Sequence, residues 1–257
     1  MDMLHAALPY APLALLVFLA GFVDAIAGGG GLITLPAYLA YGVSPFYLLG
    51  TNKLSSAMGT TVAAARFLKE TRTKADLLFI LIFLAAAGAF LGARAISLVP
   101  PEAIRYLLIV LLPPVAIFLA ARKSFGLVDT SARFHGNQLL ARSGLISFFV
   151  SFYDGLLGPG TGTFLAVAFA RLCGYDLLRA TALAKLLNLV SNLAALGAFL
   201  YLGRVHLKLG LALGLAGMAG NYAGSHLALK KGAWVIRPML FTVSAALLLK
   251  VVWNMVR

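Results

Sequence analysis

Long apolar stretches recur along the whole chain, and they restrict its fold more than any other feature. A helix needs about 20 apolar residues to cross a bilayer, and stretches of this length leave no room for a separate soluble domain. They lack the period-two alternation of a membrane β-barrel. With 61% hydrophobic and 11% charged residues among 257, the sequence predicts an all-α polytopic membrane protein.

The formal net charge of +13 lies mostly on Lys and Arg in short connecting stretches such as residues 69–74. This distribution is typical of loops on the cytoplasmic side of a membrane and does not indicate a nucleic-acid partner. A second interpretation is an electropositive path that attracts an anion. No Lys or Arg precedes the first apolar stretch, so we interpret that stretch as a membrane span and not as a cleaved signal peptide.

An internal duplication is visible in the sequence. Residues 21–31, GFVDAIAGGGG, align with residues 151–161, SFYDGLLGPGT, at an offset of 130 that pairs Asp24 with Asp154. After a two-residue gap, charged residues and glycines keep an offset of 132 over the rest of the half. A single offset held this far indicates a repeat. Pairs at this offset include Lys53 with Lys185, Gly42 with Gly174, Gly88 with Gly220 and Gly92 with Gly224.

The alignment divides the chain into repeat 1 at 9–123 and repeat 2 at 142–257, joined by a linker at 124–141 within one membrane domain, 1–257. Each half is predicted to have about four spans, which gives about eight transmembrane helices and parallel halves. If the glycine-broken segments count separately, the number rises to about ten and the halves are inverted. We favour an inverted repeat with broken or re-entrant helices, because such halves can exchange conformations around a central site. The predicted elements are 9–41, 44–68, 76–98 and 104–121, then 143–172, 176–203, 206–229 and 233–256.

Glycines interrupt the first apolar element of each half. In hydrocarbon, a broken helix is tolerated only where its freed backbone groups face protein or a water-filled cavity. Such breaks commonly form the midplane site of secondary transporters, with half-helix N-termini directed at anionic groups. The alternative is that the glycines only allow helices to cross closely, but two breaks at matching places favour a substrate site. The residues of the breaks are Gly28, Gly29, Gly30 and Gly31 in the first copy, and Gly158, Gly160, Thr161 and Gly162 in the second.

Four charged residues lie inside the apolar segments: Asp24 and Asp154 before the breaks, and Lys53 and Lys185 in the next element. A carboxylate in such a run is a functional hypothesis by default. The aspartates could cap a half-helix or pair with a lysine, carry a proton, or reach the membrane interface. A bare ammonium in low dielectric costs several kcal/mol, so the lysines must pair or lose their charge. They could hold an anion or serve as partners of the aspartates.

Polar residues accompany the lysines along the helices. Thr51 and Asn52 precede Lys53, and Asn188 lies on the same predicted helix face as Lys185. We expect these side chains to contribute to substrate binding. No Ser/His/Asp set, zinc-ligand spacing or Walker loop is present, so neither an enzyme nor a metal or other cofactor is expected.

The third predicted helix of each half carries a small-residue motif. Gly88-x-x-x-Gly92 and Gly220-x-x-x-Gly224 place both glycines on one helix face, which lets another backbone approach closely. We expect these motifs to serve helix packing. Asp176 is expected to cap the helix that follows it.

The motif G-F-x-D-x-I-A-G-G-G-G at 21–31, followed by Pro36, and A-Y-G-V-S-P followed by G-T-N-K-L at 50–54 resemble the sulfite exporter TauE/SafE family, also called the 4-toluene sulfonate uptake permease family. The second half resembles it through D-G-x-x-G-x-G-x-G and A-K-x-x-N at 184–188, so the resemblance covers nearly the whole chain. The chain departs from the paired pattern at Pro159 and Ala184, which puts equal ligand contact by both halves in doubt.

The resemblance implies a multi-pass carrier of the bacterial cell inner membrane that takes small anions, with sulfite and organosulfonates as the recurrent substrates. Its partners would be such an anion and the lipid bilayer, and a homodimer is left open. The signature positions that it implies are Asp24, Gly28 to Gly31, Pro36, Thr51, Asn52 and Lys53, with Asp154, Gly158, Gly160, Gly162, Lys185 and Asn188 in the second half.

We therefore expect a secondary transporter that moves a small sulfur-containing anion by alternating access. The amides of the breaks, with Lys53 or Lys185, would hold the anion, and Asn52 and Asn188 would orient it. Asp24 or Asp154 would carry a coupled proton. The alternatives are a passive anion channel and a non-transporting membrane scaffold or accessory subunit.

Overall fold

A computed structural model describes residues 10–70, 75–120, 128–134, 136–231 and 234. The described part contains helices and no strand, which confirms the all-α prediction. The predicted element at 233–256 falls almost wholly outside these residues. The helices are α2 (Ala11–Ala27), α3 (Gly31–Ala40), α4 (Pro45–Glu70), α5 (Ala75–Ile96), α6 (Pro101–Ala120), the short η2 (Ser131–Arg133), α7 (Gly136–Leu156), α8 (Thr161–Leu172), α9 (Leu177–Tyr201) and α10 (Leu207–Lys231).

Length and hydropathy identify candidate membrane spans among these helices. Three stretches are long and apolar enough to cross a bilayer: Leu77–Ile96, Gly136–Leu156 and Leu177–Tyr201. Helices α2, α3 and α8 are apolar but shorter. Helix α4 is long enough, but its polar stretch Thr51–Ser56 lowers its hydropathy. The fold is that of a helical membrane protein, and the number of spans stays a prediction.

Each glycine break is a turn that reverses the chain. Ser143 Oγ, two turns into α7, and Cys173 Sγ after α8 lie 3.4 Å apart, so α8 runs back along α7 to the level of Ser143. In the first half, Leu13 and Val17 of α2 pack in the same cluster as Leu35 and Tyr38 of α3. The broken elements are therefore helical hairpins and not single interrupted helices. Because α7 begins at Gly136, residues 136–141 of the predicted linker are helical.

Helices of the two predicted halves are interleaved. Helix α5 packs against α7, and α10 packs against α2, more extensively than any other helix pairs. A Cβ at Gly88 or Gly92 would clash with the carbonyl oxygen of Phe148 or Phe152 on α7. Gly220 and Gly224 lie in the same way against the carbonyls of residues 18 and 22 on α2. The predicted packing role of both glycine motifs is confirmed.

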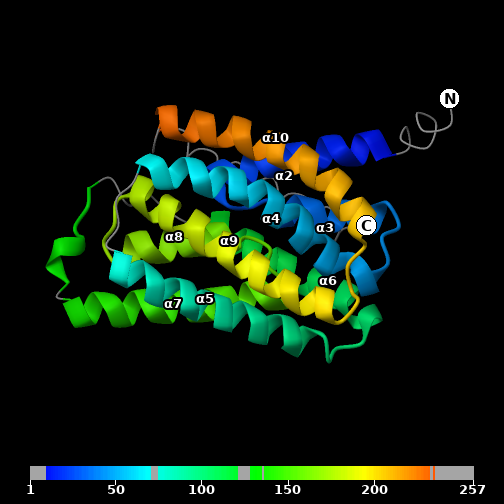
Figure 1. Ribbon diagram of the computed structural model, residues 1–257, viewed down its shortest axis with the longest axis horizontal. Coiled ribbons are helices and arrows are strands. Elements are labelled where there is room, and N and C mark those ends of the chain that lie inside the picture. Colours follow the sequence, from blue (N-terminus) through cyan, green and yellow to red (C-terminus); the bar gives the residue numbers. More distant parts are fainter. Residues whose placement is uncertain (1–9, 71–74, 121–127, 135, 232–233, 235–257) are drawn as a thin grey trace.

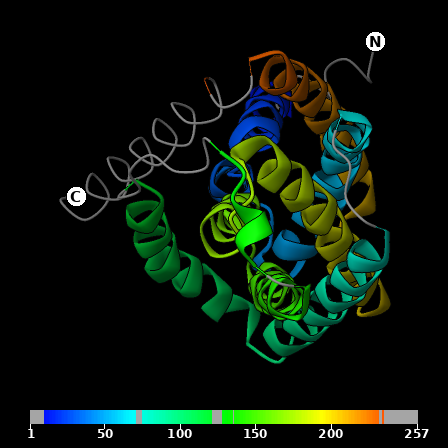
Figure 2. The same ribbon diagram turned by 90° about the vertical axis from the view of Figure 1, so that its left-hand side faces the viewer.

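Helices at equivalent positions of the repeat run in opposite directions along the long axis. Their colours in Figure 1 show that α4 runs from right to left and α9 from left to right, and the same reversal relates α10 to α5. Helices α4 and α9 pack directly on each other. Seen end-on in Figure 2, α6 lies at the periphery of the bundle. At the start of α9, the Asp176 carboxylate accepts from the Arg179 N–H at 3.0 Å, which confirms the predicted cap.

Candidate functional site

The two chain reversals meet in the interior of the bundle. The Thr163 N–H donates to the Gly28 carbonyl at 3.3 Å, and the Thr163 hydroxyl donates to the Ala27 carbonyl at 2.5 Å. Gly28 has φ +81°, a conformation that favours glycine, and a Cβ there would clash with the backbone of Gly162 and Thr163. Glycine is thus required both to turn the chain and to let the two turns touch. As a result, the N-termini of α3 and α8 come together.

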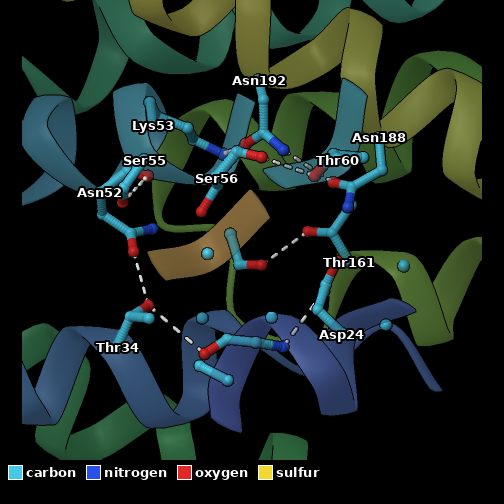
Figure 3. A pocket seen from close by; sticks show the side chains of 18 of the residues that line it. Asp24, Thr34, Asn52, Lys53, Ser55, Ser56, Thr60, Thr161, Asn188 and Asn192 are labelled. Atoms are coloured by element: carbon cyan, nitrogen blue, oxygen red, sulfur yellow. Dashed lines mark hydrogen bonds between the residues drawn. The ribbon is translucent and has the colours of Figure 1, made fainter. Parts of the chain in front are cut away.

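A cavity of about 40 Å³ lies where the turns meet (Figure 3). It is walled by α2, α3, α4, α8, α9 and α10, together with Asp154 near the end of α7. Most of the residues predicted to form the site line this cavity. These are Asp24, Gly28, Gly30, Gly31, Asn52, Lys53, Asp154, Gly158, Thr161, Gly162 and Asn188.

Four predicted site residues do not line the cavity. Gly29 and Gly160 belong to the turns behind it. The Thr51 hydroxyl oxygen accepts from the His206 N–H at 3.0 Å, so this side chain anchors the start of α10 instead. Lys185 lies behind Asp24 and is 1% exposed. The structure therefore gives Thr51 and Lys185 contacts within the protein.

Each of the two aspartates forms an ion pair with a lysine of the other predicted half; Asp154 is buried, and the Asp24 side chain is 14% exposed. Lys53 Nζ lies 2.7 Å from Asp154 Oδ2, and both side chains are almost completely buried. Lys185 Nζ lies 3.2 Å from Asp24 Oδ2. The carboxylate of Asp24 also accepts from the Gly30 N–H at 3.1 Å, as a cap at the start of α3. Of the roles open from sequence, the structure shows pairing for both aspartates and capping for Asp24, while proton transfer and exposure at the membrane interface stay predictions.

Two asparagines leave amide donors free at the cavity. Asn52 Oδ1 accepts from the Thr34 hydroxyl at 2.5 Å, and Asn188 Oδ1 accepts from the Asn192 amide at 3.4 Å. Within the described part of the chain, no hydrogen-bond acceptor is recorded for the Nδ2 groups of Asn52 and Asn188. These two residues lie on opposite sides of the view in Figure 3. The site thus offers N–H donors from both repeats.

Sequence reasoning did not assign several polar residues of this cavity to the site: Thr34, Ser55, Ser56, Thr60, Asn192 and Asn221. Thr34 sets the orientation of the Asn52 amide by donating to its oxygen. Asn221 is 3% exposed and donates to the Gly217 carbonyl at 3.0 Å on its own helix, α10. An amide inside the apolar run between Gly220 and Gly224 is a signal that could have identified Asn221 from sequence.

A helical membrane bundle with reversed, glycine-broken helices around a buried polar cavity has the architecture of a membrane transporter. The sequence profile described as Sulfite exporter TauE/SafE matches residues 13–251, and the chain belongs to this family. The family consists of transporters and not of enzymes.

Relatives of similar length carry matching names. A Sinorhizobium sp. protein named "Probable membrane transporter protein ORF9" is 39% identical over 233 residues, which cover 91% of this chain and 88% of that relative. "Probable membrane transporter protein YfcA" of Escherichia coli K12 is 36% identical over 92% of this chain and 87% of its own. A "Probable membrane transporter protein" of Haemophilus influenzae is 36% identical over 92% of both chains. No solved structure gives a significant match.

Proposed function

We propose that the protein is a secondary transporter of the bacterial inner membrane that moves sulfite or a small organosulfonate by alternating access. The observation that carries this proposal is the cavity where the N-termini of two half-helices meet beside Lys53 and the free amides of Asn52 and Asn188. A cavity rich in N–H donors, with a cation in its wall, is suited to an oxyanion. The family description names a sulfite exporter, and we assign sulfite as the substrate class of this chain on that basis.

Helix dipoles add to the attraction for an anion. Each N-terminus carries the equivalent of about +0.5 charge, whereas the C-termini of α2 and α7, which also end at the turns, each carry about −0.5. At the C-terminus of α2, Lys185 Nζ donates to the Asp24 carbonyl and Thr163 donates to the Ala27 carbonyl. The protein itself therefore satisfies the end of α2. Most amides at the starts of α3 and α8 also donate within the protein, so the amides available for a ligand are those of Gly31 and Gly162, which line the cavity and have no acceptor among the described residues.

The buried charges support coupling to protons. Lys53 and Lys185 balance Asp24 and Asp154, so the site is neutral when empty. An anion that enters adds a negative charge at low dielectric, which is costly unless it is compensated. A proton on Asp24 or Asp154 restores neutrality. Anion binding therefore strengthens as pH falls on the side that the site faces.

The reversed helices provide a way to alternate access. Equivalent helices run in opposite directions (Figure 1), as in inverted-repeat transporters whose halves rearrange around a fixed central site. The cross-half pairs Lys53–Asp154 and Lys185–Asp24 would hold that centre while the interleaved helices move around it.

The size of the cavity favours a compact substrate. A volume of 40 Å³ is only a few times the roughly 10–15 Å³ that one water molecule needs. A small inorganic oxyanion such as sulfite therefore needs less widening of the site than an organosulfonate does.

The test is uptake of radiolabelled sulfite and organosulfonate into proteoliposomes that contain the purified protein. We expect uptake by the wild type and at least a tenfold loss after Lys53→Ala plus Lys185→Ala; unchanged uptake would remove the lysines from the mechanism. A passive anion channel would not accumulate the anion in proportion to a pH gradient. A scaffold would show neither uptake nor a thermal shift with sulfite.

A further inference from the structure

The two ion pairs differ in how many of their side chains line the cavity. Lys53 and Asp154 both line it, whereas in the other pair only Asp24 does. Lys185 Nζ contacts both the backbone carbonyl and the carboxylate of Asp24. The Asp24 carboxylate in turn accepts from the Gly30 N–H. The Asp24–Lys185 pair thus ties the end of α2 to the start of α3, and its lysine does not line the cavity.

Lys53 has capacity left for a ligand. Its ammonium has three N–H groups, of which one reaches Asp154 Oδ2 at 2.7 Å and one reaches Asn192 Oδ1 at 3.0 Å. While Asp154 is ionised, its charge cancels that of Lys53. Protonation of Asp154 would release a cation at the cavity wall, whereas protonation of Asp24 would release only Lys185, which lies behind it.

Ser191 gives Asp154 a hydrogen-bond arrangement for both protonation states. The Ser191 oxygen lies 2.6 Å from Asp154 Oδ2 and 3.0 Å from the Asn188 carbonyl oxygen. Because a hydroxyl carries one hydrogen, Ser191 can donate to the ionised carboxylate. When Asp154 is protonated, Ser191 can turn to donate to the Asn188 carbonyl and accept the proton of the acid. Neither state then leaves a buried polar group unpaired.

Asp24 lacks this arrangement. At the offset of 132, Ser191 corresponds to Gly59, which has no hydroxyl. The two aspartates are therefore equivalent in the repeat and different in their chemistry.

We propose that Asp154, and not Asp24, carries the coupled proton, that Lys53 alone of the two lysines binds the anion, and that Ser191 accommodates Asp154 in both protonation states. A proton from the aqueous side adds to the Asp154 carboxylate, and a Lys53 N–H···O bond passes from that carboxylate to an oxygen of the anion. Release on the other side reverses both events. Other titratable groups lie around Asp154. Lys53 belongs to α4, and the paired Asp24 and Lys185 belong to α2 and α9. The hydroxyl of Tyr153, the residue before Asp154, donates to the Pro159 carbonyl at 2.8 Å.

The inference rests on the proposed function and is tested by removing each pair as a neutral unit. Removing one partner leaves an uncompensated buried charge, whereas removing both avoids that penalty. Lys53→Met with Asp154→Asn should lose sulfite uptake at least tenfold while keeping its thermal unfolding temperature. Lys185→Met with Asp24→Asn should lower the unfolding temperature and reduce uptake, but the uptake that remains should keep its rise at lower pH. Loss of this rise in the folded Lys185→Met, Asp24→Asn variant, or uptake that survives Lys53→Met with Asp154→Asn, would overturn the inference.

Ser191→Ala provides a test that leaves every charge in place. It should reduce the pH dependence of sulfite uptake severalfold, whereas Ser147→Ala, at a buried serine that donates to the Ser143 carbonyl outside the cavity, should leave it unchanged. An unchanged pH dependence in Ser191→Ala would contradict the role of the hydroxyl. If the wild type takes up no sulfite, the proposed function itself fails.

Discussion

The contact between the two chain reversals can be measured with a pair of alanine substitutions. Gly28 and Gly42 have almost the same backbone conformation, with φ +81° and +78°. A Cβ in this left-handed region costs about 1–2 kcal/mol. At Gly42 nothing lies within 4 Å of the added Cβ, so Gly42→Ala should lower the free energy of unfolding by this amount alone.

Gly28→Ala adds a steric term to the same conformational cost. Its Cβ would meet the backbone of Gly162 and Thr163, so the two turns must separate. Separation breaks the two hydrogen bonds that Thr163 donates to the Ala27 and Gly28 carbonyls. Buried groups left unpaired cost about 1–3 kcal/mol each, which gives a further loss of about 2–6 kcal/mol.

The assay is thermal unfolding in detergent, with sulfite uptake measured on the same preparations. At about 2–4 °C per kcal/mol for a chain of this size, Gly42→Ala should lower the unfolding temperature by about 2–8 °C, and Gly28→Ala should lower it by at least about 4 °C more. We also expect Gly28→Ala to lose uptake, because the N-termini of α3 and α8 no longer meet. Equal unfolding temperatures for both variants would refute the argument that contact between the turns stabilises the site.

Three further predictions concern the ligand and the orientation of the halves. Asn52→Leu should raise the KM for sulfite about tenfold or more, because a hydrogen bond to a charged group is worth about 1.5–3 kcal/mol, whereas Thr51→Val should leave it unchanged; equal effects would show that the Asn52 amide does not contact the anion. Methanesulfonate should compete with sulfite uptake better than 4-toluenesulfonate does, and equal competition would contradict a compact site. The end of α4 and the start of α10 lie at opposite ends of the bundle in Figure 1. With Cys173 replaced by serine, single cysteines at Lys69 in the last turn of α4 and at Lys208 in the first turn of α10 should therefore be labelled from opposite faces of the membrane; labelling from one face would exclude the inverted arrangement.

The sequence was sufficient to predict most of the residues that line the cavity but not their contacts. The repeat alignment predicts that Asp24 is equivalent to Asp154 and that Lys53 is equivalent to Lys185. It does not predict that each aspartate pairs with the lysine of the other half, because this pairing depends on how the helices of the two halves interleave. The same alignment could not choose between a hairpin and a single broken helix, since both need the same glycines.

Helix phase explains why one neighbour of Lys53 lies at the cavity and the other does not. Asn52 and Thr51 are adjacent in sequence, but successive side chains of a helix point about 100° apart. Asn52 lines the cavity, and Thr51 meets the backbone of His206. Sequence gives the angle between the two side chains. Only the positions of α3 and α10 determine which of them faces the cavity.

Counterflow of sulfite tests the central claim most directly. Proteoliposomes loaded with unlabelled sulfite are diluted into a trace of radiolabelled sulfite, with no gradient of pH or voltage. An alternating-access site must return from the inner face with anion bound, so we predict a transient accumulation of label above its equilibrium level, which Lys53→Ala abolishes. Label that rises only to equilibrium, or an overshoot that survives Lys53→Ala, would contradict alternating access at this site.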